Sequence, residues 1–444
     1  MATSEALPLR EELVGTAITA AGSTEGSPTR VPAHRYHSPE FARAEHERLW
    51  PRVWQIACSL DHVASPGDYY EYRCGRYSVL IVRGRDGELR AFQNVCQHRG
   101  NVLCTGSGSG LRNLRCSYHG WVYDLKGELR GVPSRRGFGE MDHAELSLSP
   151  VRVDCWGPLV FVNLDTDAMP LDEYLEGVPA DIAWADIDAF HCPYSVHTPA
   201  PANWKLVADG YSETYHVQTL HREMLGSMDD IDAPQHIWGR HGVSRSHYGV
   251  PSPRLSDPSD QQVWDSFIVT QGARMGIEEP CPVPPIPEGR TVQDLIARQL
   301  REHHAKRGVD LSPFTDSDQL LVLNQYNLFP NATVLVNAEI LSVMTATPGP
   351  TPDEAVLSMI HFDRQPPDTP RSRPHDAQVP FEQADFGFVL NQDVDVLRNA
   401  QTGVRQPGFT HLHLSSEEIR IINMHRNLER YLDISPSEMS GGPR

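Results

Sequence analysis

The chain has 444 residues, a hydrophobic fraction of 39% and a formal net charge of -19. This composition suits a soluble globular protein of about two or three domains. The negative charge disfavours nucleic acid as a partner, and no apolar run approaches the ~18 residues of a membrane span. Because the first residues lack the basic start and apolar block of a signal peptide, we expect a cytoplasmic location without membrane contact.

The predicted elements begin after a flexible N-terminal tail, residues 1–35, which is rich in Ala, Ser, Thr, Gly and Glu. A helix is predicted over residues 36–51. Ser38, Pro39 and Glu40 supply its cap residue, its first-turn proline and its first-turn acid. We expect this helix to pack on the C-terminal domain.

Residues 52–168 have the pattern of a small antiparallel β domain. Short β-rich runs at 77–82 and 89–92 flank the turn residues Arg85-Asp86-Gly87, which predicts a hairpin. A late strand is predicted over 157–164. Gly and Asn residues between the hairpin and this strand indicate loops.

Residues 169–435 show helical periodicity mixed with strands, and 436–444 is predicted to be a C-terminal tail. Ser415 and Glu418 form a capping box that marks the start of the last helix. The predicted helices lie near 203–225, 292–306 and 415–432, and the predicted strands near 332–347 and 354–362.

The densest chemistry of the chain lies in two short motifs, Cys96-x-His98 and Cys116-x-x-His119. Thiolates and imidazoles are borderline-soft donors, so two of each can close around metal from two facing loops. A structural zinc site is one alternative, but zinc ribbons usually pair Cys with Cys. One Cys and one His in each loop suit an iron-sulfur cluster with one iron held by sulfur and the other by nitrogen.

The two motifs resemble those of the Rieske family. The shared features are the seventeen residues between His98 and Cys116, the Arg-Gly after the first His and the Gly-Trp after the second. The resemblance implies a two-iron, two-sulfur cluster with Cys96 and Cys116 on one iron and His98 and His119 on the other. Neutral imidazoles would raise its reduction potential above that of all-thiolate clusters.

A second candidate metal site begins at Asn203-Trp204-Lys205. On a helix, Asp209, Glu213 and His216 would share one face, and His221 follows where the helix could unwind toward the same point. Two histidines and a carboxylate are typical of non-heme iron(II), with positions left open for dioxygen. The alternative is a helix with polar residues facing solvent.

This segment resembles the catalytic helix of Rieske oxygenase large subunits, the ring-hydroxylating dioxygenase family. The resemblance implies that His216 and His221 bind iron. It also implies that Glu213 is the carboxylate that links a cluster histidine of one subunit to an iron-bound histidine of the next. Many ring-hydroxylating members have Asp in place of Glu213 and Glu-Asn in place of Ala208-Asp209. Glu is familiar in members resembling carnitine and choline monooxygenases.

The third iron ligand should be a carboxylate from the C-terminal half. In the family pattern an Asp is followed eight residues later by Gln and then x-Gly, which Asp393, Gln401 and Gly403 match. The resemblance therefore favours Asp393. Asp395 is the nearest rival, and an exposed helical acid without a metal is the remaining alternative.

Family resemblance over roughly residues 36–432 implies an α+β fold. An N-terminal Rieske antiparallel β domain would precede a catalytic domain with a helix-covered antiparallel sheet of the helix-grip, START-like kind. Electrons from NAD(P)H would arrive through a ferredoxin and/or a flavin reductase, because the sequence has no G-x-G-x-x-G fingerprint. The resemblance also implies a head-to-tail homotrimer, with a β subunit possible.

We expect an oxygenase component that hydroxylates an aromatic or other ring substrate with O2. Glu213 favours an alternative, a monooxygenase acting on an N- or O-methyl group or a quaternary ammonium compound. Candidate aromatic residues around such a cation are Trp264, Phe267, Tyr326 and Phe329, which core packing would explain equally. A distant alternative is a non-catalytic Rieske electron-transfer protein.

Overall fold

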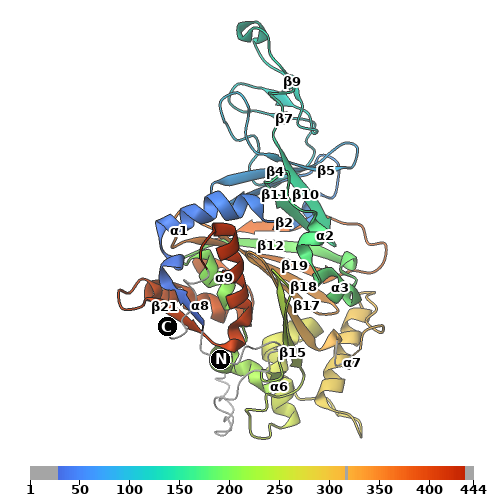
Figure 1. Ribbon diagram of the computed structural model, residues 1–444. Coiled ribbons are helices and arrows are strands. Elements are labelled where there is room, and N and C mark those ends of the chain that lie inside the picture. Colours follow the sequence, from blue (N-terminus) through green and yellow to red (C-terminus); the bar gives the residue numbers. More distant parts are fainter. Residues whose placement is uncertain (1–28, 316–318, 436–444) are drawn as a thin grey trace.

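The computed structural model describes residues 29–315 and 319–435. Figure 1 shows a slender β-rich domain at the top and a larger domain of helices and a wide sheet beneath it. Within the described ranges, no helix is both long and apolar enough to cross a membrane. The predicted tail at 436–444 and residues 1–28 of the predicted N-terminal tail lie outside the described residues.

Residues 29–35 correct the prediction of a flexible tail, because they are folded. Strand β1, Thr29–Pro32, pairs antiparallel with β21, His411–Leu414. A 3-10 helix, Ala33–Tyr36, follows and buries Tyr36. The partner strand lies near the other end of the chain, so local composition gives no sign of this pairing.

The helix predicted over 36–51 is present in a shorter form. Helix α1 spans Pro39–Ala44, and the Ser38 side chain accepts a hydrogen bond from the Phe41 backbone N–H. A π-helical turn and a 3-10 turn extend it to Arg52. Trp50 packs edge-on against Trp204 of the C-terminal domain, with ring centroids 5.0 Å apart.

The upper domain contains an antiparallel seven-stranded sheet in the order β2-β11-β10-β5-β4-β3-β6. The predicted hairpin is β4–β5, and Gly87 in its turn has φ +83°. A three-stranded sheet, β7-β8-β9, lies toward the tip in Figure 1. The strands are β2 Gln55–Ser59, β3 Tyr69–Cys74, β4 Tyr77–Arg83, β5 Leu89–Gln93, β6 Ser107–Gly108, β7 Leu114–Arg115, β8 Val122–Tyr123, β9 Leu129–Gly131, β10 Pro150–Trp156 and β11 Leu159–Asn163.

The lower domain is organised around a nine-stranded sheet, antiparallel except where β20 pairs parallel with β12. The strand predicted near 332–347 is two strands, β17 and β18, because a turn at Asn337 reverses the chain: the Asn337 N–H donates to the Ile340 carbonyl at 2.9 Å. The strands are β12 Phe190–Ala200, β13 Met228–Asp229, β14 Gln235–Ile237, β15 Gly242–Tyr248, β16 Val322–Leu328, β17 Ala332–Val336, β18 Ile340–Pro348, β19 Ala355–Arg364 and β20 His375–Gln378.

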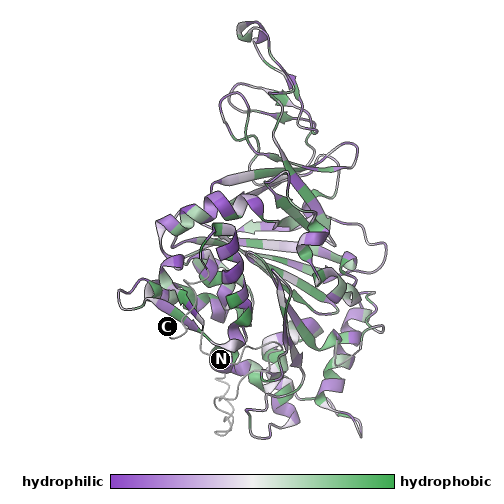
Figure 2. Cartoon of the chain, in the orientation of Figure 1, coloured by the Kyte–Doolittle hydropathy of each residue, from purple (hydrophilic) through white to green (hydrophobic). Residues whose placement is uncertain are grey.

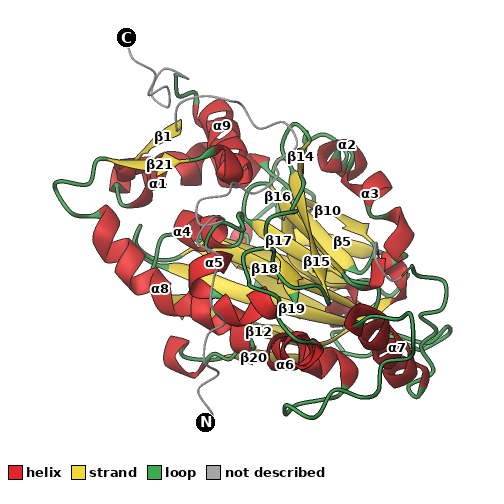
Figure 3. Ribbon diagram, turned by 90° about the horizontal axis from the view of Figure 1, so that it is seen from below, coloured by secondary structure: helices red, strands yellow, loops and turns green. Residues whose placement is uncertain are grey.

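Helices surround this sheet, as the view from below in Figure 3 shows. Helix α4 contacts β18, β19 and α8. Figure 2 shows green along many of the strands, whereas helix α9 carries much purple on its visible side. The helices after α1 are α2 Leu171–Leu175, α3 Val178–Asp181, α4 Trp204–Gly210, α5 Val217–Leu220, α6 Asp260–Gln271, α7 Val292–Ala305, α8 Phe388–Val404 and α9 Ile419–Leu432.

Buried polar contacts connect three distant segments around the start of α4. The Lys205 ammonium lies 2.6 Å from the Glu45 carboxylate, and both side chains are almost fully buried. The Asn203 N–H donates to the Gln401 side-chain oxygen of α8 at 2.7 Å. The Gln401 amide in turn donates to Asp353. These contacts fix α4 against both the N-terminal helix and α8.

Candidate metal centres

The two Cys-His loops of the upper domain have matching backbone conformations. In the first loop the Cys96 N–H donates to the Asn101 carbonyl at 2.8 Å, and the Gly100 N–H donates to the Cys96 carbonyl at 3.0 Å. In the second, Cys116 and Gly120 make the equivalent bonds at 2.8 and 3.0 Å. Both glycines have φ +74°, a conformation that favours glycine. The matching turns present each motif in the same way.

The side chains of the four predicted cluster ligands converge between these loops. The rings of His98 and His119 have centroids 4.6 Å apart. The Nδ1 atom of each ring is buried and has no hydrogen-bond partner within the described ranges. A buried ring nitrogen without a partner is costly, and a metal ion would satisfy it. The donor set therefore fits a two-iron, two-sulfur cluster.

The thiol of Cys116 is prepared for ionisation. Burial acts to raise its pKa, but hydrogen bonds from the backbone N–H groups of Tyr118 and His119 and from the Cys96 and Asn101 side chains together bring its pKa below the usual value. A cysteine binds metal as its deprotonated thiolate, so the hydrogen bonds that lower the pKa of Cys116 favour metal binding. Burial raises the pKa of Cys96.

The surface around the cluster loops exposes apolar side chains. Tyr118 is 54% exposed and Val102 39% exposed. The Arg99 guanidinium lies over the Tyr118 ring, 5.1 Å from its centroid. Exposed aromatic residues beside a redox centre are suited to contact with another protein surface.

The segment from 203 to 225 is not the continuous helix that we predicted. Helix α4 ends at Gly210, and the next helical turn, α5, starts at Val217. The Tyr211 carbonyl accepts hydrogen bonds from the side-chain amides of Gln325 at 2.6 Å and Asn327 at 3.0 Å. These contacts with β16 remove the carbonyl from the helical pattern, so Glu213 and His216 lie on a turn.

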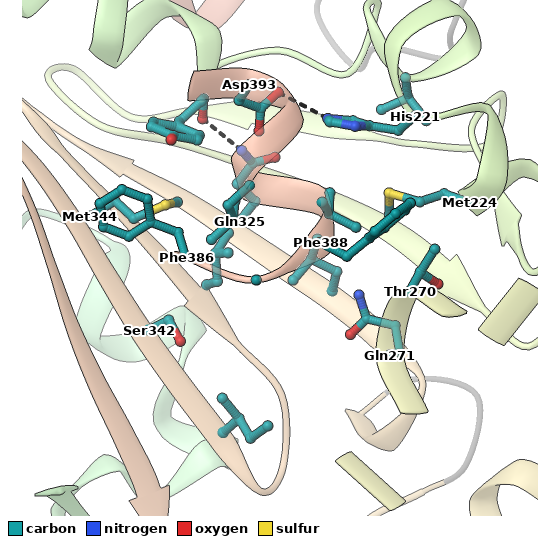
Figure 4. A pocket seen from close by; sticks show the side chains of 18 of the residues that line it. His221, Met224, Thr270, Gln271, Gln325, Ser342, Met344, Phe386, Phe388 and Asp393 are labelled. Carbon is teal, nitrogen blue, oxygen red and sulfur yellow. Dashed lines mark hydrogen bonds and ion pairs between the residues drawn. The ribbon is translucent and has the colours of Figure 1, made fainter. Parts of the chain in front are cut away.

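The structure brings His216, His221 and Asp393 together. One ligand atom from each lies within 4.8 Å of the others. Asp393 Oδ1 is 3.4 Å from His216 Nε2 and 2.9 Å from His221 Nε2. Two imidazoles and one carboxylate at this spacing fit a mononuclear iron with open coordination positions. Figure 4 shows Asp393 on α8 facing His221.

The far side of each imidazole is held by a second group. His216 Nδ1 lies 2.5 Å from Glu213 Oε1, and His221 Nδ1 lies 2.7 Å from Gln392 Oε1. Acceptors at Nδ1 place the proton there and leave the Nε2 lone pairs directed toward Asp393. Burial acts to lower the pKa of His216, but Glu213 and then Asp393 raise it above the usual value.

The two rival carboxylates of α8 occupy different environments. Asp393 is 7% exposed and faces the histidines, whereas Asp395 is exposed to solvent. Asp209, which we predicted as a catalytic residue together with Glu213, does not line the cavity beside His216 and His221. It accepts a 2.6 Å hydrogen bond from Tyr36, and burial raises its pKa to about 7.

A cavity of about 310 Å³ opens beside His216, His221 and Asp393. This volume is within the range of small-molecule sites, ~300 to 1,000 Å³. Figure 4 shows Phe386, Phe388 and the methionines Met224 and Met344 along its walls. A small organic molecule can therefore enter next to the three candidate ligands.

None of the four aromatic residues predicted around a cation lines this cavity. Trp264 and Phe267 belong to one hydrophobic core, and Tyr326 and Phe329 to another. Many of the residues that do line it come from β16 to β19, α6 and the loop before α8, where the sequence shows only ordinary strand and helix patterns. Gln392 also went unpredicted, although its position beside Asp393 was a usable signal.

Comparison with known families identifies both domains. A family model described as "Ring hydroxylating alpha subunit (catalytic domain)" matches residues 183–434. One described as "Rieske [2Fe-2S] domain" matches residues 53–150. The two matches coincide with the lower and the upper domain.

Several relatives are similar over part of their length. The chain is 30% identical over 225 residues to carnitine monooxygenase oxygenase subunit of Escherichia coli, 50% of this chain and 59% of the relative. It is 32% identical to choline monooxygenase of Spinacia oleracea, over 43% of this chain and 45% of the relative. It is 30% identical to benzene 1,2-dioxygenase subunit alpha of Pseudomonas putida, over 51% of this chain and 55% of the relative. The matches thus span roughly half of each relative.

Solved structures share the fold. A quaternary ammonium Rieske monooxygenase superposes with a TM-score of 0.67 at 18% identity, covering 91% of this chain and 96% of the other. A naphthalene 1,2-dioxygenase superposes with a TM-score of 0.66 at 17% identity, covering 93% and 94%. At these identities the similarity establishes the α+β fold of both domains.

Proposed function

Because the chain belongs to the family of ring-hydroxylating alpha subunits, with a Rieske domain preceding its catalytic domain, we propose that it is the oxygenase component of a Rieske non-heme iron oxygenase. The observation that carries the proposal is the convergence of His216, His221 and Asp393 at the wall of a cavity. A plain electron-transfer protein would have no need of this second site.

The two centres have separate sets of protein ligands. Cys96, His98, Cys116 and His119 would hold the cluster, and His216, His221 and Asp393 would hold the mononuclear iron. When bound, these groups supply one-electron transfer and the activation of dioxygen.

The protein's own residues orient and shield the second site. Glu213 and Gln392 fix the two imidazoles through Nδ1, and the apolar wall residues exclude water from the space beside them. Asp393, itself buried, supplies a negative charge that offsets the charge of a metal cation. A substrate in the cavity would lie next to the open coordination positions.

Electron supply would come from partners. We infer that a ferredoxin and/or a flavin reductase delivers electrons from NAD(P)H. We further infer a head-to-tail homotrimer, in which Glu213 accepts a contact from the cluster histidine of a neighbouring copy. The exposed Tyr118 beside the cluster and the exposed Tyr215 beside His216 support such a heterologous interface.

For the reaction, we propose hydroxylation of an aromatic or other ring compound. The apolar walls with Phe386 and Phe388 favour a flat or hydrophobic substrate. Monooxygenation of a quaternary ammonium compound is the second candidate. Its support is Glu213 and the similarity to carnitine and choline monooxygenases.

Iron analysis of the purified chain tests the proposal. We expect three irons per chain and a Rieske signal in electron paramagnetic resonance. His216→Ala should keep the cluster absorption, lose one iron and abolish substrate-dependent oxygen uptake. Two irons per wild-type chain would indicate a plain electron carrier, and zinc in place of iron would exclude both.

A further inference from the structure

The charges around the cavity are unequally distributed. Its lining includes two acids, Glu213 and Asp393, and both contact the candidate iron ligands or belong to them. Among the described lining residues, the one arginine or lysine is Arg274, on the 3-10 helix Gly272–Met275. The cavity therefore has an acidic side at the metal site and a cation at another part of its wall.

The guanidinium of Arg274 has unused hydrogen-bonding capacity. Its side chain is 5% exposed. Nε donates to Glu339 at 2.6 Å, and Nη2 donates to the Leu320 carbonyl at 3.0 Å. Nη1 is buried and has no partner among residues 29–315 and 319–435. Glu339 does not line the cavity, so it contacts the guanidinium from behind the cavity wall.

A second free polar group lies three residues earlier, at the end of α6. The side-chain amide of Gln271 makes no hydrogen bond within the described part of the chain and lines the same cavity. Figure 4 shows Gln271 well separated from Asp393, with Phe388 and Met224 between them. The order across the cavity is thus metal site, apolar walls and polar end.

We propose that the natural substrate carries a carboxylate, which Arg274 and Gln271 bind at this polar end. A carboxylate offers two oxygens, one for the Arg274 guanidinium and one for the Gln271 amide, and hydrogen bonds to a charged group are about twice as strong as neutral ones. The apolar part of the substrate then extends past Phe388 toward His221 and Asp393. This inference rests on the proposed function, because it concerns the substrate of the same site.

The test measures binding of matched acids and amides to the holoenzyme by calorimetry. The probes are benzoate, phenylacetate and 3-phenylpropionate, each beside its own amide. We expect at least one acid to bind roughly tenfold or more tightly than its amide, as a charge-assisted bond implies. Equal affinities within every pair, or no binding of any acid, would overturn the proposal.

Variants of Gln271 locate the binding group, because the Gln271 side chain makes no hydrogen bond within the described part of the chain. Gln271→Glu should remove the preference for the acid, since the new carboxylate pairs with Arg274 and repels the probe. Gln271→Leu should lower the affinity for the acid by a few-fold, because one hydrogen bond is lost. Gln299→Glu, which adds the same charge on α7 outside the cavity, should leave the preference intact.

An acid that simply ligates iron would keep its preference in Gln271→Glu, and that result would contradict the inference. Iron content separates this failure from failure of the proposed function. Three irons per chain together with no preference for the acids would reject the proposed carboxylate site and leave the proposed oxygenase function standing. Fewer than three irons would reject the oxygenase itself.

Discussion

The two metal-binding regions of this chain are built by different means. The proposed cluster ligands all lie within residues 96–119, and each loop closes with its own backbone hydrogen bonds. The proposed iron ligands are His216 and His221, which flank α5, and Asp393 on α8. A local motif is sufficient for the first site, whereas the second depends on the packing of distant segments. Variants in each region can therefore break or preserve one site independently of the other.

Replacing the carboxylate of the second site should empty that site and leave the first intact. Asp393→Ala should reduce the iron content from three per chain to two without changing the Rieske resonance signal. Asp395→Ala, on the exposed side of the same helix, should keep all three irons. Loss of iron in Asp395→Ala, measured by the same metal analysis, would instead favour the rival ligand.

Breaking a buried ion pair should damage the lower domain most. Lys205→Met leaves the Glu45 carboxylate buried without its partner, which typically costs about 3 to 5 kcal/mol of unfolding free energy. Urea denaturation measures this loss. The double variant Lys205→Met with Glu45→Gln should recover part of it. A single variant as stable as the wild type would show that α4 does not depend on this pair.

Asp209 should give the lower domain a characteristic pH dependence. Burial raises its pKa to about 7 in the folded state, against about 3.9 when unfolded. The folded chain then holds the proton more tightly, so stability falls as pH rises from about 4 to about 7. Asp209→Asn should lessen this fall by up to about 4 kcal/mol, the free energy of about three pKa units. If chemical denaturation gave the same pH dependence of stability for the wild type and Asp209→Asn, the raised pKa of Asp209 would be refuted.

The smallest expected effect concerns the group behind His221. Gln392→Leu removes the acceptor at 2.7 Å from Nδ1, and loss of such a contact lowers metal affinity by about ten- to a hundredfold. We expect an effect near the lower limit, measured by competition with an iron chelator. Gln392→Glu keeps an acceptor and should retain the iron. Equal affinities in the wild type and Gln392→Leu would remove this orienting role.

Sequence reasoning was strongest where the chemistry is local. The spacing of Cys96, His98, Cys116 and His119 predicted their convergence, and family resemblance placed Asp393 beside the two histidines. Helical periodicity misled us between 210 and 217, because amides of β16 capture the Tyr211 carbonyl. The pairing of β1 with β21 was unpredictable for the same reason: its partner is remote in sequence.

The substrate end of the cavity was also beyond prediction. Arg274 and Gln271 lie in a helix and a turn with no recognisable motif. They become informative only when the fold places them on the cavity wall and shows which of their donors have no partner. Binding specificity therefore depends on side chains whose roles are visible only in three dimensions.

The Gln401 amide has a consequence for how the family can diversify. Its oxygen joins Asn203, the residue before α4, to α8, and so ties together the two segments that carry the proposed iron ligands at a point outside the cavity. The lining side chains of β18 and β19 make no part of this contact, so a change of side chain there alters the cavity without touching the bond between α4 and α8. The side chains that select a substrate and the bond that ties the two candidate ligand segments together are therefore different parts of the molecule.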